Sequence, residues 1–315
     1  MTEAVQQALT LWGFAGARCD FVAGRENRVY RVHTNEGDFA LRLKRPGYRS
    51  EAELWSELQW LDAIDRAGLH VPRPRRSLSG KLLEQVGGGF ADLIGWMHGT
   101  PLGEGQAPLA LADGPLVFRR LGQILARLHE ASDAWTYPPG FTRCSWDADG
   151  LLGEDPVWGC FWENPTLDPE ARALLERFRV QARQALKRYA DRLDYGLIHA
   201  DPLRENVLVD GEEIKLLDFD DGGFGFRLFD IATALLRNMD EPDYPTLKAA
   251  LLEGYREVRP LDDRLLDLFL ALRAVTYVGW IVPRMGEAGA EERNARFNAR
   301  ASRLCASFLG ETHSV

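Results

Sequence analysis

The segment of residues 199–221 carries the densest set of side chains that could perform chemistry. Asp201 stands five residues before Asn206. Two β-rich runs follow, at residues 207–209 and 214–219, joined by an Asp-Gly pair, and the second run contains Asp218. An Asp-Gly pair between β-rich runs predicts a hairpin, which brings Asn206 and Asp218 to the same end. An amide oxygen and a carboxylate at one end could hold a divalent cation, while the loop carboxylate could accept a hydroxyl proton. The segment therefore offers the kinds of groups that phosphoryl transfer to an alcohol uses.

The same segment resembles the catalytic core of the aminoglycoside phosphotransferase and choline kinase superfamily, near its homoserine-kinase-type and stress-response-kinase branches. The family pattern is H-G-D-L-H-x-x-N followed by D-F-[DE]. The positions that match are His199, Asp201, Asn206, Asp218, Phe219 and Asp220. The positions that depart are Ala200, Pro202 and Leu203, so one histidine that offers a phosphate contact is absent. No departure removes a group that carries the chemistry.

The resemblance implies a role for each matching residue. Asp201 is expected to be the catalytic base, which takes the proton of the acceptor hydroxyl. The expected Mg²⁺ ligands are Asn206, Asp218 and Asp220. His199 and Asp230 are expected to support the site, because residues 229–232 read F-D-I-A and resemble the family's D-x-A stretch. The implied cofactors are ATP and Mg²⁺.

Composition limits the class of protein. The chain has 315 residues, of which 45% are hydrophobic and 27% charged, as in a folded soluble protein. A net charge of −9 argues against a general nucleic-acid binder. No apolar run approaches the ~18 residues of a membrane span, and the N-terminus does not read as a signal peptide. Four dispersed cysteines fit a reducing compartment, so we expect a cytoplasmic protein without a membrane or nucleic-acid partner.

The first 95 residues predict a small nucleotide-binding lobe. β-Rich runs at residues 17–23, 29–34, 38–44, 81–86 and 90–94 predict an antiparallel sheet of about five strands. Helices are expected at the N-terminus and over residues 50–67. The turn from Gly24 to Asn27 corresponds, by resemblance, to the loop that covers the nucleotide phosphates; a plain hairpin turn is the alternative.

Alternation in residues 39–44 places Arg42 and Lys44 on one face of a strand. The family's phosphate clamp falls on Arg42, where Lys is usual, and arginine keeps the charge and adds a bidentate fork. Lys44 is the alternative clamp, and Glu57 on the following helix is the implied ion-pair partner of Arg42. The alternative is that Arg42 and Lys44 are solvated strand residues without a role in phosphate binding, which would give the same pattern.

Residues 96–315 predict a larger, mainly helical lobe for catalysis and acceptor binding, entered through a linker at residues 96–99. Trp96 and Met97 in this linker are implied adenine contacts, although apolar packing predicts the same residues. The Trp-rich stretch of residues 133–165 either shapes an acceptor site, with Arg143 and Trp146 as candidates, or is pinned to the core by its aromatic side chains. The fold class is α+β, a bilobed protein-kinase-like fold.

These features predict an ATP- and Mg²⁺-dependent phosphotransferase whose acceptor is a small hydroxyl compound such as an amino alcohol, homoserine-like amino acid or aminoglycoside. One alternative is a protein Ser/Thr kinase of the bacterial stress-response type. Another is a catalytically silent nucleotide-binding protein, because Arg42 replaces lysine. A metal-dependent hydrolase is disfavoured, because six scattered histidines supply few ligands.

Overall fold

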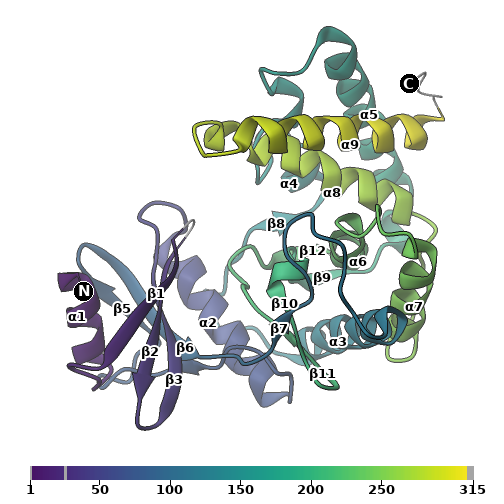
Figure 1. Cartoon of the computed structure of the whole chain (residues 1–315). Coiled ribbons are helices and arrows are strands. Elements are labelled where there is room, and N and C mark those ends of the chain that lie inside the picture. Colours follow the sequence, from purple (N-terminus) through teal and green to yellow (C-terminus); the bar gives the residue numbers. More distant parts are fainter. Residues whose placement is uncertain (1, 25–26, 311–315) are drawn as a thin grey trace. The chain divides into compact units, whose positions relative to one another are not determined.

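A computed structural model of the chain describes residues 2–24 and 27–310 (Figure 1). The chain divides into two compact units. The first comprises Met1–Leu102, Glu130–Arg143 and Asn206–Asp220, and the second comprises Gly103–His129, Cys144–Glu205 and Asp221–Val315. The two lobes predicted from the sequence, with a boundary after residue 95, remain a prediction.

The first unit is built on an antiparallel sheet. Its order is β1-β2-β3-β6-β4, and β5 also pairs with β6. The strands are β1 (Arg18–Gly24), β2 (Arg28–Thr34), β3 (Gly37–Leu43), β4 (Pro74–Arg75), β5 (Leu83–Val86) and β6 (Gly89–Gly95). The five predicted strands are confirmed within about two residues. The two-residue β4 was not predicted, because so short a strand leaves no β-rich run.

Helices cover both faces of this sheet. Helix α1 (Glu3–Leu11) packs on the face that carries Leu41 and Leu93, and α2 (Glu51–Arg66) packs on the face that carries Ala40 and Ile94. Ser50 caps the N-terminus of α2: its hydroxyl accepts from the Glu53 amide, and the Glu53 carboxylate accepts from the Ser50 amide. The face of β3 turned to α2 is the one on which the sequence placed Arg42 and Lys44.

A second, smaller sheet in the first unit contains the predicted hairpin. Strands β10 (Val207–Asp210) and β11 (Glu213–Leu216) pair antiparallel, and β7 (Thr100–Pro101) pairs with β10. The sequence extended the second strand to Phe219, which is wrong. The strand ends at Leu216 because the chain then turns at Asp218, whose φ of 59° lies in the left-handed region.

The second unit is mainly helical around a short mixed sheet. The strands are β8 (Ser145–Trp146), β9 (Tyr195–Ile198) and β12 (Gly223–Phe226), in the order β8-β12-β9. The helices are α3 (Gly114–Ala134, whose last turn belongs to the first unit), α4 (Ala148–Leu152), α5 (Pro169–Arg188), α6 (Arg227–Leu236), α7 (Tyr244–Arg256), α8 (Leu266–Trp280) and α9 (Ala290–Leu309). Single 3₁₀ turns occur at Phe161–Glu163, Ala190–Arg192, Arg204–Asn206 and Val282–Arg284. The centre of the unit is α6 and α8, which are buried along nearly their whole length.

Two glycines let α3 and α7 touch through their backbones. A Cβ on Gly122 would stand 2.0 Å from the carbonyl oxygen of Leu251, and a Cβ on Gly254 would stand 1.9 Å from that of Arg119. No real Cβ approaches so closely, so each glycine opens the space that the other helix fills. The described helices include none with the length and apolar character that a membrane span requires.

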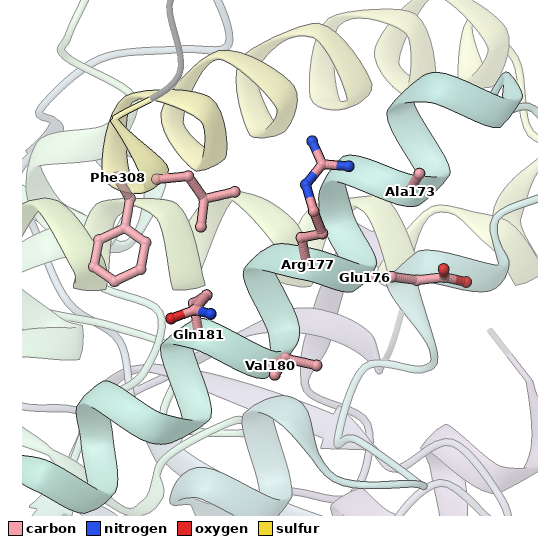
Figure 2. A pocket seen from close by; sticks show the side chains of 7 residues that line it. Ala173, Glu176, Arg177, Val180, Gln181 and Phe308 are labelled. Carbon is pink, nitrogen blue, oxygen red and sulfur yellow. The ribbon is translucent and has the colours of Figure 1, made fainter.

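A surface cavity of about 740 Å³ lies between α5 and the end of α9 (Figure 2). Its lining consists of Ala173, Glu176, Arg177, Val180, Gln181, Phe308 and Leu309. No residue that the sequence assigned to a site is among them.

Candidate active site

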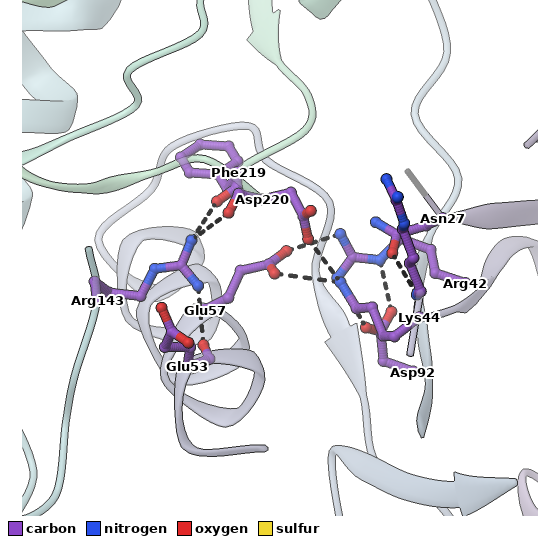
Figure 3. A network of polar contacts seen from close by, with 10 residues as sticks. Asn27, Arg42, Lys44, Glu53, Glu57, Asp92, Arg143, Phe219 and Asp220 are labelled. Atoms are coloured by element: carbon purple, nitrogen blue, oxygen red, sulfur yellow. Dashed lines mark hydrogen bonds and ion pairs between the residues drawn. The ribbon is translucent and has the colours of Figure 1, made fainter. Parts of the chain in front are cut away.

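A buried ionic network joins three elements of the first unit (Figure 3). Arg42 on β3 donates from Nε to Oδ1 of Asp92 at 2.7 Å and from Nη2 to Oδ2 at 3.0 Å. Its Nη1 donates to Oε1 of Glu57 on α2 at 2.8 Å. Arg42 and Asp92 are direct cross-strand partners of β3 and β6. The pair predicted between Arg42 and Glu57 is therefore present, and Asp92 supplies a second, bidentate partner.

Lys44 lies in the same network and extends it to the Asp-Phe-Asp segment. Its Nζ lies 3.3 Å from Oε2 of Glu57, 3.3 Å from Oδ2 of Asp92 and 3.2 Å from Oδ1 of Asp220. Arg42 and Lys44 are only 6% and 5% exposed, so the interpretation of both as solvated strand residues is wrong. Lys44 therefore connects the β3 strand to one of the predicted cation ligands.

The charges in this network stabilise one another. Burial and the Arg42 charge both oppose a charged Lys44, but Asp92, Glu57 and Asp220 outweigh them and raise the Lys44 pKa. Burial likewise opposes an ionised Glu57, but Arg42 and Lys44 hold its pKa far below the usual value. Arg143 adds a third positive charge that lowers the Glu57 pKa, so the cations and carboxylates of the network offset one another.

The predicted cation ligands lie at the open end of the hairpin. The Leu217 amide donates to the carbonyl oxygen of Asn206 at 2.8 Å, which fixes Asn206 opposite the residue before Asp218. The donor set is one amide oxygen and the carboxylates of Asp218 and Asp220, and Mg²⁺ is commonly held by one or two carboxylates with water in its remaining positions. No three His, Cys, Asp or Glu side chains among the described residues form a metal cage. The residues present fit Mg²⁺ by donor type.

Arg143 holds the backbone of the Asp-Phe-Asp segment. Its Nη2 donates to the carbonyl oxygens of Phe219 at 3.0 Å and Asp220 at 2.7 Å, and its Nη1 donates to that of Glu53 at 2.9 Å (Figure 3). The side chain is nearly buried. These bonds attach the segment to the start of α2, so they give Arg143 a positioning role, and its acceptor role stays a prediction.

Trp146, the second acceptor candidate, is fully buried in the second unit. Its indole N–H donates to the carbonyl oxygen of Asp221 at 2.9 Å, and its ring stacks on Phe229 at 5.3 Å. These contacts favour the interpretation of the Trp-rich stretch as a segment pinned to the core. Its acceptor role also remains a prediction.

In the second unit, Asp230 anchors the start of the loop that carries Asp201, the predicted base. Its carboxylate accepts from the backbone amides of His199 at 2.8 Å and Ala200 at 2.6 Å. Nε2 of His129 lies 3.0 Å from the same carboxylate, and Nδ1 of His129 lies 2.7 Å from the Tyr255 hydroxyl. Asp230 is therefore placed to tie down the loop, as the D-x-A resemblance implies.

These bonds explain a departure from the family pattern. Ala200 has φ 64°, in the left-handed region where glycine costs nothing and alanine costs about 1 kcal/mol. The hydrogen bond from its amide to Asp230 holds this conformation. Alanine can therefore replace the usual glycine without a change of loop geometry.

Asp201, the predicted base, has a buried arginine as its partner in the same unit. Nη2 of Arg273 on α8 donates to Oδ1 of Asp201 at 2.6 Å. The Arg273 side chain is fully buried, while that of Asp201 is 17% exposed. The sequence assigned no role of this kind to Arg273, because the two residues lie 72 positions apart.

Comparisons with known proteins agree with this arrangement. Residues 19–268 match the model of the "Phosphotransferase enzyme family". The chain belongs to this family. An amicoumacin kinase of Bacillus subtilis is 27% identical over 298 residues, which are 88% of this chain and 83% of that protein. A homoserine kinase of Gluconobacter oxydans is 30% identical over 250 residues, 76% of this chain and 72% of that protein.

Solved structures show the same fold. A microcompartment-associated aminopropanol kinase superposes with a TM-score of 0.82 at 29% identity, covering 97% of both chains. The amicoumacin kinase hAmiN, in complex with AMP-PNP, Ca²⁺ and Ami, superposes with a TM-score of 0.74 at 23% identity and covers 95% of this chain and 92% of its own. The predictions of an α+β protein-kinase-like fold and of a phosphotransferase are confirmed.

The predicted nucleotide contacts of this phosphotransferase lie in separate parts of the first unit. Gly24 ends β1, where a Cβ would stand 2.9 Å from the ring of Phe21, and the two residues after it lie outside the described part of the chain. Oδ1 of Asn27 lies 3.4 Å from the amide of Arg45. The roles of Gly24 and Asn27 in phosphate binding remain predictions.

Trp96 and Met97 directly follow β6 and are partly buried. The guanidinium of Arg31 covers one face of the Trp96 indole at 4.6 Å, and Arg31 is in turn held by the carboxylate of Asp38. If Trp96 contacts adenine, it would therefore do so with the part of its indole ring that Arg31 does not cover. The adenine roles of both residues stay predictions.

Proposed function

We propose that this phosphotransferase transfers the γ-phosphate of ATP to the hydroxyl group of a small amino alcohol or hydroxy amino acid, with Mg²⁺. The observation that carries the proposal is the 3.2 Å contact between Lys44 and Asp220, because it joins a phosphate-binding cation to a cation ligand. The names of the similar aminopropanol and homoserine kinases support this acceptor class. The nucleotide analogue and Ca²⁺ of hAmiN are consistent with a nucleotide and a divalent cation.

The geometry favours Lys44 over Arg42 as the phosphate clamp. Each of the three guanidinium nitrogens of Arg42 donates to a carboxylate of Asp92 or Glu57 at 2.7–3.0 Å. The contacts of Lys44 are longer, at 3.2–3.3 Å, and one of them points to the Asp-Phe-Asp segment. In this proposal Arg42 holds Glu57 and Asp92 in place, and these carboxylates hold Lys44 charged toward the phosphates.

The remaining residues act on the acceptor and on the leaving group. Asp201 orients the acceptor hydroxyl and takes its proton as the oxygen bonds to the γ-phosphorus; the bond to the β,γ-bridging oxygen breaks and ADP leaves. Asn206, Asp218 and Asp220 would hold Mg²⁺. When bound, this ion neutralises negative charge on the phosphates. Most of the rate would come from positioning and charge stabilisation.

The test is ADP release with ATP, Mg²⁺ and a panel of acceptors that contains 1-amino-2-propanol, homoserine, choline and a serine-containing protein substrate. We expect turnover with an amino alcohol or hydroxy amino acid, reduced at least about 100-fold in Asp201→Asn. Asp210→Asn, an exposed acid in the hairpin, is the matched control and should keep full activity. Turnover with the protein substrate alone would instead favour the protein-kinase alternative.

Nucleotide binding, measured separately from turnover, tests whether the protein is a catalytically silent nucleotide-binding protein. A fluorescent ATP analogue should bind to wild type and to Asp201→Asn with similar affinity, since Asp201 acts on the acceptor. Lys44→Met should weaken this binding about tenfold or more, because a charge-assisted phosphate contact is lost. Binding without turnover for every acceptor in the panel would support the catalytically silent alternative.

A further inference from the structure

The pair of Arg273 and Asp201 belongs to the second unit, and Arg273 is its buried member. Nη2 of Arg273 lies 2.6 Å from Oδ1 of Asp201, which is the distance of a strong charge-assisted hydrogen bond. The Arg273 side chain has no exposed surface, so it reaches the loop from inside the helical core. Asp201 is thus held from the core on one side, while part of its side chain is exposed.

Arg273 is itself fixed by its surroundings. Its Nη1 donates to the hydroxyl oxygen of Thr276 at 2.8 Å, and its Nη2 lies 3.2 Å from the hydroxyl of Tyr277. Its guanidinium carbon lies 4.6 Å from the ring centre of Trp158 and 4.2 Å from that of Tyr277. Hydrogen bonds and cation–π contacts therefore hold the guanidinium plane in one orientation.

The burial of the Arg273 guanidinium destabilises the fold, so helix packing alone does not explain an arginine at this position. Among the described residues, Nε of Arg273 is buried without a hydrogen-bond partner. An unsatisfied buried donor destabilises the folded state, and well-packed apolar residues are often at least as stable as a buried ion pair. The hydrogen bonds of Arg273 to Thr276 and Tyr277 stay within α8, whereas the one to Asp201 leaves the helix and reaches a charged group.

We infer that Arg273 is a positioning residue that fixes the direction of the Asp201 carboxylate during phosphoryl transfer. The inference rests on the proposed role of Asp201 as the base. A carboxylate on a short loop can rotate about χ1 and χ2, whereas a planar guanidinium bonded to Oδ1 sets the direction of the whole group. The acceptor hydroxyl then meets the carboxylate in one geometry, which is the condition for efficient proton transfer.

The test is a double-mutant cycle in the full chain. Arg273→Met, Asp201→Asn and the double variant are compared with wild type in steady-state assays with ATP and the best acceptor. We expect Arg273→Met to lower kcat about 10- to 100-fold while the KM for ATP changes less than about twofold. In the Asp201→Asn background the same substitution should change kcat less than about twofold, since no base remains to be positioned.

Arg273→Lys is the conservative variant. It keeps the charge but lacks the planar fork, so we expect kcat between those of wild type and Arg273→Met. Tyr277→Phe and Thr276→Val provide a second route if Arg273→Met does not fold, because each removes one contact that orients the guanidinium. Both should lower kcat several-fold in wild type and have no effect in the Asp201→Asn background.

The outcomes separate this inference from the proposed function. Multiplicative losses in the double variant, or an Arg273→Met enzyme with wild-type kcat, would overturn the positioning role. Full turnover in Asp201→Asn would overturn the proposed function instead. Loss of turnover in Asp201→Asn together with non-additive loss in Arg273→Met supports both.

Discussion

His129 should make the stability of this phosphotransferase fall as the pH is lowered from 7.5 to 5. The imidazole is fully buried, and this burial, together with the charge of Arg227, lowers its pKa from 6.5 to about 4 despite the opposing effect of Asp230. A neutral ring with its hydrogen on Nε2 can donate to Asp230 and accept from Tyr255 through Nδ1, which matches both contacts. The folded state therefore keeps His129 neutral where the unfolded chain would protonate it.

The size of the effect follows from these two values. Below pH 6.5 the unfolded chain binds a proton at His129 that the folded protein does not bind until about pH 4, so stability falls across this window. The loss is about 2 kcal/mol at pH 5 and about 3 kcal/mol when both states are protonated. Burial opposes ionisation of Asp230, but the hydrogen bonds from His129 and from the His199 amide hold its pKa below the usual value, so Asp230 stays ionised in this window and adds no slope.

The assay is urea unfolding at pH 7.5, 6 and 5, followed by the fluorescence of the nine tryptophans. His129→Gln replaces the ring by an amide that can donate and accept without titrating, so it should lose about 2 kcal/mol less than wild type between pH 7.5 and 5. His98→Gln changes an exposed histidine and should keep the wild-type pH dependence. Equal pH dependence in wild type and His129→Gln would refute the reasoning.

Three further predictions concern a buried ion pair, the packing of two helices and a strained backbone position. Asp92→Asn should lower the free energy of unfolding by about 3 kcal/mol, measured by urea titration, because it leaves the buried charge of Arg42 without its bidentate partner. Gly122→Ala should lower the melting temperature by 5 °C or more in calorimetry, since its Cβ would stand 2.0 Å from the carbonyl oxygen of Leu251; a shift under 1 °C would contradict this contact. Ala200→Val should destabilise by about 2 kcal/mol and lower kcat, whereas Ala200→Gly should change stability by less than about 1 kcal/mol, because only a β-branched residue is strongly strained at φ 64°.

The sequence predicted those secondary-structure elements whose patterns of residue types lie within a few positions of one another. The Asp-Gly turn predicted the hairpin of β10 and β11, and its register places Val207 opposite Leu216 at the end that carries Asn206. The alternation of residues 39–44 predicted the face of β3 that turns to α2. The ion pair of Arg42 and Glu57 followed from family resemblance, because nothing local links the two positions.

The sequence did not predict the contacts of residues whose partners are distant in the chain. Asp92 is an isolated acid in a strand of apolar residues, and only the pairing of β3 with β6 reveals it as the partner of Arg42, 50 positions away. The sequence made Arg143 a candidate for the acceptor site, and it did not predict that Arg143 binds carbonyl oxygens 76 and 77 positions further on. Side-chain chemistry alone does not encode such contacts, because they depend on strand order and on helix packing.

The loop that carries the proposed base, Asp201, is held within the second unit on both sides of that residue. Before it, Asp230 binds the amides of His199 and Ala200. After it, the buried Arg204 donates to Oδ1 of Asn238 at 2.7 Å, to the carbonyl oxygen of Ala107 at 2.7 Å and to Oε1 of Glu241 at 2.6 Å.

These anchors account for two unusual features of the loop. The strained φ of Ala200 costs about 1 kcal/mol, which is less than the charge-assisted bonds to Asp230 contribute. Leu203 stands where the family pattern has a histidine, but Arg204 beside it fixes the loop from the core. Arg204 holds the loop that carries Asp201, and these hydrogen bonds of Arg204 go to residues other than the predicted nucleotide-binding ones, so Arg204→Met should lower kcat more than it raises the KM for ATP.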